Sequence, residues 1–94
     1  MSRYLTDFRV AIEKDAERHL FLLDYYDTFT GNICIPLEVF LSDDDIRKDA
    51  FSLLESENLV NFDANWCLTR SLIGDEDGEL IEGVVLTAIQ NIFA

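Results

Sequence analysis

Apolar side chains recur at spacings of three and four residues through the first quarter of the chain. The repeating positions are Leu5, Phe8, Ile12, Ala16, His19, Leu23 and Tyr26. This spacing predicts one long helix from about Ser2 or Thr6 to about Asp27, ending before Gly31. Further apolar residues at 21–25 widen the stripe, so the second half of the helix is expected to be covered on more than one side. The cover is either the core or a dimer seam.

A short β-branched run follows Gly31 and is closed by a proline. Residues Ile33 to Ile35 predict a brief strand. The next segment, Leu37 to Leu41, fits either a short helix entered through Pro36 or a second strand. The pattern leaves both open.

The clearest helix signal begins at Ser42. Ser42 can cap a first turn, and the acids that follow it favour the positive end of a helix dipole. Asn58 stands where a left-handed residue usually ends a helix. We therefore predict a helix from Asp43 to Glu57. Its buried face is predicted to hold Ile46, Ala50, Leu53 and Leu54.

Residues after Asn58 predict a β-hairpin. Residues 59–62 and 66–69 are rich in strand-forming side chains, and the turn formers 63–65 separate them. The hairpin would add two strands to the strand at Ile33.

A wide apolar stripe between residues 80 and 92 predicts a last helix, from about Asp75 to about Phe93. The acids at its start suit a helix N-terminus. Gly78 and Gly83 each weaken a helix by about 1 kcal/mol relative to alanine, so packing is expected to stabilise it.

The 94 residues are expected to form one domain, residues 1–94, around a single core. The predicted elements make a small α+β domain with a long N-terminal helix, a short three-stranded sheet and a C-terminal helix. The sequence starts without an apolar signal core, and its longest apolar runs are too short to span a bilayer. We expect a cytoplasmic protein in a bacterial or host cell.

This order of elements, from Ile33 to Thr69, resembles the winged helix-turn-helix superfamily. The run "LESENLV" ending at Val60 is similar to the passage from recognition helix into wing, with Asn58 where many members have glycine. The resemblance implies that the strand at Ile33 pairs with residues 66–69, which would bring Cys34 close to Cys67. It also implies DNA contact through the start of the helix that follows Ser42.

The charge of the chain argues against that DNA contact. The formal net charge is −12, and all of it falls on residues 19–94, where only Arg47, Lys48 and Arg70 oppose the acids. Such a surface repels phosphates and attracts basic partners. Three aspartates stand where the resemblance would place DNA-reading residues, so no direct nucleic-acid binding is expected, and no membrane binding.

We therefore expect an acidic protein-binding inhibitor or adaptor. One form would be a DNA-mimicking viral anti-defence or immunity protein that blocks a basic nucleic-acid-binding partner. The candidate partner-binding residues are Asp43, Asp44, Asp45, Asp49, Glu55, Glu57, Asp75, Glu76, Asp77 and Glu79. Ordinary helix capping explains each cluster taken alone. The alternatives are a winged-helix DNA-binding transcriptional regulator and a structural homo-oligomer subunit.

No motif predicts an enzyme, a metal or a cofactor. His19 fits a packed or surface histidine, and the two cysteines lack the spacing of a zinc or redox site. The run "DEDGE" shares part of an EF-hand loop. Placing Gly78 at the invariant glycine, however, puts Ile73 and Val84 at the first and last ligand positions, which require acids.

Overall fold

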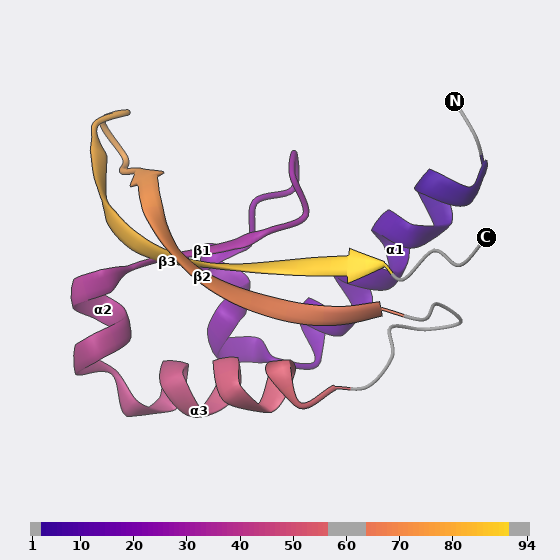
Figure 1. The fold of residues 1–94 in the computed structure, drawn as a ribbon, viewed down its shortest axis with the longest axis horizontal. Coiled ribbons are helices and arrows are strands. Elements are labelled where there is room, and N and C mark those ends of the chain that lie inside the picture. Colours follow the sequence, from indigo (N-terminus) through magenta and orange to yellow (C-terminus); the bar gives the residue numbers. More distant parts are fainter. Residues whose placement is uncertain (1–2, 57–63, 91–94) are drawn as a thin grey trace.

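A computed structural model describes residues 3–56 and 64–90, and within them the chain is an α+β fold (Figure 1). The elements in chain order are α1 (Arg3–Glu17), the 3-10 helix η1 (Leu20–Tyr25), β1 (Ile33–Pro36), α2 (Leu37–Ser42), α3 (Asp44–Leu54), β2 (Ala64–Gly74) and β3 (Leu80–Gln90). The strands of this part form one antiparallel three-stranded sheet in the order β1-β3-β2. The α+β class and the three-stranded sheet are thus confirmed.

The register divides the sheet into two different faces. Residues directly opposite one another share a face, so Ile33, Leu86 and Leu68 form one row. Cys34 lies opposite Val85 in the next row, on the other face. In Figure 1, η1, α2 and α3 lie below the sheet and α1 rises from there toward the right, while the loop before β1 and the tip of the β2–β3 hairpin rise above the sheet.

The core lies between the helices and the sheet face that carries Leu86. Its apolar side chains come from every helix and strand. The buried residues are Ala11, Ile12, Leu22, Ile33, Ile35, Phe40, Ile46, Ala50, Leu53, Trp66, Val84 and Leu86. Burial of these side chains is the main stabilising contribution to the fold.

The prediction of one long N-terminal helix is wrong for the second half of that segment. The α-helix ends at Glu17, and η1 follows after a break at His19, whose φ is −116° and ψ 76°. Ala16 and Leu22 are both fully buried. In a continuous α-helix these two side chains, six residues apart, would point about 120° away from each other, and the break at His19 lets both be buried.

The middle of the chain follows the prediction, with two corrections, one at each end of the helix that follows Ser42. This helix ends at Leu54, with Glu55 as its C-cap, and not at Glu57 as predicted. The strand at Ile33 is confirmed, and the ambiguous segment after it is a helix, α2. The predicted helix that follows is confirmed as α3, but its cap is Asp43 rather than Ser42. Asp43 Oδ1 accepts hydrogen bonds from Asp45 N at 3.0 Å and Ile46 N at 3.2 Å. Ser42 Oγ instead donates to Val39 O.

Replacing Asp43 with alanine is expected to lower the free energy of unfolding by about 1 kcal/mol, because two N–H groups of α3 lose their acceptor. Urea denaturation followed by circular dichroism measures this change. Ser42→Ala is the matched control, and we expect it to change the free energy by less than about 0.5 kcal/mol. A larger effect at Ser42 than at Asp43 would contradict this cap.

The predicted C-terminal helix is wrong, because residues 80–90 form β3, the central strand. A central strand carries apolar side chains on both faces, and its continuous apolar run can imitate a helical stripe. Gly83 is the residue whose role differs between a helix and a strand. A Cβ placed there would lie 2.9 Å from Ile35 O and 2.7 Å from Ile73 Cδ1, so the strand-to-strand approach requires glycine.

The predicted hairpin turn is also misplaced. Ala64 and Asn65 belong to β2, and the hairpin joins β2 to β3 through residues 75–79. Residues 59–62, predicted as its first strand, lie outside the described residues. β1 pairs with β3 and not with residues 66–69, so β3 separates Cys34 from Cys67, and both are free thiols.

Candidate functional site

The acids at the start of α3 have different local roles. Asp43 is the helix cap, and Asp44 pairs with Arg47 one turn later. Asp45 is exposed in the first turn. Asp49 is half-buried, with Oδ1 3.0 Å from His19 Nδ1 and Oδ2 accepting from Phe21 N at 3.1 Å. Asp49 therefore holds η1 against α3 and is not free to bind a partner.

The acids of residues 75–79 form a hairpin tip instead of a helix start. Asp75 Oδ1 accepts from Asp77 N at 2.9 Å and from Glu79 N at 2.8 Å, which fixes the turn. Gly78 has φ of +80°, a conformation that glycine adopts without strain. The side chains of Glu76, Asp77 and Glu79 are exposed around this fixed backbone.

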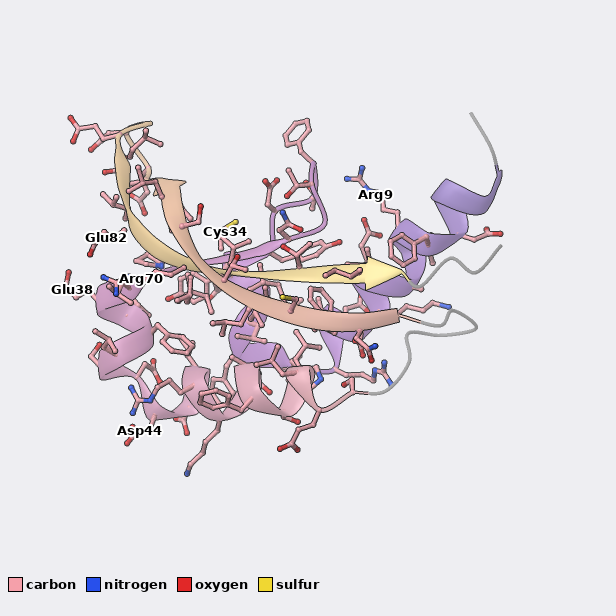
Figure 2. The ribbon with its side chains drawn as sticks, in the orientation of Figure 1. Arg9, Cys34, Glu38, Asp44, Arg70 and Glu82 are labelled. Carbon is pink, nitrogen blue, oxygen red and sulfur yellow. The ribbon has the colours of Figure 1, made fainter. Side chains whose placement is uncertain are left out.

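These two groups lie at one end of the long axis of the molecule. In Figure 2, Glu38, Asp44 and Glu82 are all at the end where α2 lies, and the hairpin tip rises at the same end in Figure 1. We call this surface the acidic end. It comprises the exposed residues Glu38, Asp44, Asp45, Glu76, Asp77, Glu79 and Glu82. Glu38 and Glu82 were not among the predicted site residues.

The structure does not bring every predicted residue to this surface. Glu55 follows the last turn of α3, and an 11-residue helix of about 16 Å separates it from Asp44. Asp43 and Asp49 are engaged in the hydrogen bonds described above, and Asp75 uses Oδ1 to fix the hairpin turn. Glu57 lies outside the described residues.

Two cations near the acidic end are already engaged within the fold. Arg47 donates to Phe40 O at 2.8 Å and to Leu41 O, and it also pairs with Asp44. Arg70 pairs with Glu82 across the β2–β3 hairpin at 3.3 Å. These contacts leave the surface acidic and reduce what either guanidinium can offer to a phosphate.

A groove lies on the open face of the sheet, and the end of η1 forms part of one of its walls. Its volume is about 780 Å³, and its walls are the segment 24–32 and the β2–β3 tip. Cys34, Thr69 and Val85 lie in one row across its floor. Figure 2 places Cys34 between the two walls.

The titratable groups of the groove have shifted pKa values. The Phe29 N–H and the Thr30 hydroxyl donate to the Asp27 carboxylate at 2.9 and 3.0 Å, and they hold its pKa below the usual value. Burial raises the pKa of the Cys34 thiol, and the Asp27 charge adds to this. Burial likewise raises the pKa of Tyr26, and Glu13 adds to it. Near neutral pH, therefore, Asp27 is charged while Cys34 and Tyr26 are neutral.

The described part of the chain offers no group of three or more His, Cys, Asp or Glu that could hold a metal ion. No helix in that part is long and apolar enough to cross a membrane. His19 is partly buried beside Asp49 and joins two structural elements. No known protein family, curated protein or solved structure matches the chain.

The groove is the feature that sequence reasoning missed. The sequence pattern places Tyr25 and Tyr26 on a long helix and residues 80–90 on another helix, so it predicts no open sheet face at this position. Two local signals point to it. An aspartate, a threonine and Gly31 occur within "DTFTG", and "GDEDG" sets acids between two glycines. Both compositions are typical of tight turns between strands.

Proposed function

We propose that this protein is a binding module that recognises a basic protein through the acidic end, and that it acts as an inhibitor or adaptor. The observation that carries the proposal is the gathering of carboxylates from α2, α3 and the hairpin tip on one end, while Arg47 and Arg70 bond within the fold. Clustered charge of one sign increases the rate and selectivity of association with a partner of opposite sign.

The architecture is proposed to be a variant of the winged helix. Support comes from the order α1, β1, α2, α3, β2, β3 and from the β2–β3 hairpin, which would be the wing. In that arrangement the start of α3 and the wing tip are the parts that would face DNA. Here these parts carry Asp44, Asp45, Glu76, Asp77 and Glu79. The proposed module therefore presents carboxylates where a DNA-binding relative would present cations, as a mimic of DNA would.

The two alternative functions have less support. A DNA-binding regulator needs cations that reach phosphates, whereas Arg47 is held by two backbone carbonyls of α2. A structural homo-oligomer would assemble through the apolar columns of the first or last predicted helix. Ala11, Ile12 and Ala16 of α1 are buried within the monomer, and the predicted last helix is a strand.

Removing two charges from the hairpin tip is expected to weaken binding of the basic partner at low salt by at least about fivefold. The variant is Asp77→Asn with Glu79→Gln, which keeps the Asp75 hydrogen bonds to backbone N–H groups. The measurement captures partners from nuclease-treated extract on the tagged protein, identifies them by mass spectrometry, and then titrates the purified partner against both proteins.

The matched control is Glu13→Gln with Glu17→Gln. It removes the same charge from α1, which extends to the opposite end of the molecule (Figure 1). If the two double variants weaken binding equally, the effect reflects net charge alone, and this result would contradict a role for the acidic end. A captured partner that competing duplex DNA displaces would support mimicry.

A further inference from the structure

We infer that the groove on the open sheet face binds a short extended segment of the basic partner, in which an apolar side chain is flanked by Lys or Arg. This inference rests on the proposed function, because it assigns a second contact to the same partner. The groove meets the acidic end only at Glu76, since the other residues of the acidic end, Asp77 and Glu79 among them, do not line it.

The floor of the groove suits an apolar side chain. Cys34 and Val85 are half-buried neighbours across β1 and β3, and the Cys34 thiol is neutral. Ile73 and Ile81 are paired at the hairpin end of the floor. Ile73 is buried although it lies on the open face, because it extends over Gly83, which has no side chain. The resulting hollow would remove a Leu or Val side chain from water.

The rims of the groove suit cations. Asp24 and Asp27 line the wall before β1, and Asp75 and Glu76 line the hairpin wall. Asp27 and Asp75 are each fixed by two hydrogen bonds, so their charges are pre-organised on opposite walls. The lining contains no Lys or Arg within the described residues.

The aromatic groups of the groove strengthen this match. Tyr25 and Tyr26 lie on the same wall as Asp24 and Asp27. A tyrosine ring face attracts ammonium and guanidinium groups, and Arg in particular stacks on such rings. The carboxylates on the two walls have the opposite charge to the Lys or Arg side chains of such a segment. The apolar floor between the walls matches the segment's central apolar side chain.

The test titrates three capped pentapeptides into the full-length protein labelled with 15N. The first peptide alternates Arg and Leu, the second alternates Arg and Ser, and the third alternates Glu and Leu. We expect the Arg-Leu peptide to shift the amide signals of Cys34, Thr69 and Val85 saturably. The Arg-Ser peptide should bind at least about tenfold more weakly because it lacks the apolar side chain, and the Glu-Leu peptide should not bind.

Thr69→Lys places a cation on the floor of the groove, and we expect it to weaken binding of the Arg-Leu peptide at least about tenfold. Ser52→Lys adds the same charge on α3, outside the groove, and should change the affinity less than about twofold. If Thr69→Lys does not fold, Asp24→Lys on the exposed rim makes the same test.

Three results would overturn the inference. The first is that the amide signals of Cys34, Thr69 and Val85 do not shift when the Arg-Leu peptide is added. The second is equal binding of the Arg-Leu and Arg-Ser peptides, which would indicate a site for cations alone. The third is a shift of the floor signals with protein concentration alone, which would indicate a second copy in the groove. If no peptide binds in the groove but binding of the basic partner still requires Asp77 and Glu79, the inference fails and the proposed function stands.

Discussion

Replacing Asp15 with alanine is expected to lower the free energy of unfolding by about 3 kcal/mol. Asp15 is fully buried, and its Oδ2 accepts a hydrogen bond from Trp66 Nε1 at 2.6 Å. Its Oδ1 pairs with Arg18. The substitution would leave the indole N–H of a buried tryptophan without an acceptor and would remove a link between α1 and β2.

Trp66 is the only tryptophan of the chain, so its fluorescence during urea unfolding reports this change directly. Asp15→Asn keeps an acceptor oxygen at the same place and should cost about 1 kcal/mol. Arg18→Ala should cost less than about 1 kcal/mol, because the arginine side chain is mostly exposed. A loss at Arg18 as large as that at Asp15 would show that the ion pair, and not the indole hydrogen bond, is the important contact.

The second large effect is expected at Leu86, where replacement by alanine should lower the free energy of unfolding by about 3 kcal/mol. Leu86 is fully buried in the central strand between Ile33 and Leu68. Removing three carbon atoms there leaves a cavity that the rigid sheet cannot close. Chemical denaturation with two spectroscopic probes gives the free energy.

Leu80→Ala is the matched control for Leu86, because Leu80 lies in the same strand but is mostly exposed. We expect it to change the free energy by less than about 0.5 kcal/mol. The pair also tests the secondary structure, since a helix over residues 75–93 would place Leu80 on the apolar stripe and Leu86 off it. A larger loss at Leu80 would support the helix and contradict β3.

Prediction from the sequence succeeded where neighbouring residues determine the secondary structure. The strand at Ile33 and the helix after Ser42 depend on neighbouring residues, and the structure confirms both. Of the predicted buried face of this helix, Ile46, Ala50 and Leu53 are buried and Leu54 is partly buried. The cap was displaced by one residue, because Asp43 and Ser42 are both good caps and only the backbone angles distinguish them.

Prediction from the sequence failed where contacts between residues distant in the chain determine the local structure. The pattern of β3 is ambiguous because this strand is covered by β1 and β2 on its edges and carries apolar side chains on both faces. After the break at Glu17, η1 is held by a residue distant in the sequence, since the Asp49 carboxylate on α3 accepts a hydrogen bond from the Phe21 N–H. The groove could not be predicted for the same reason, since it exists only when residues 80–90 form a strand.

The position of β3 in the sheet also determines how the chain can fold during synthesis. β3 is the last strand along the described residues, yet it lies between β1 and β2, and its register joins Ile33 to Leu86. At ribosomal speed, β1 would wait about 3 to 10 s for residue 90. During that time α3 can form, but Ile33 and Ile35 have no strand partner. A nascent chain arrested before Leu80 would therefore lack the central strand and expose apolar side chains to chaperones and proteases.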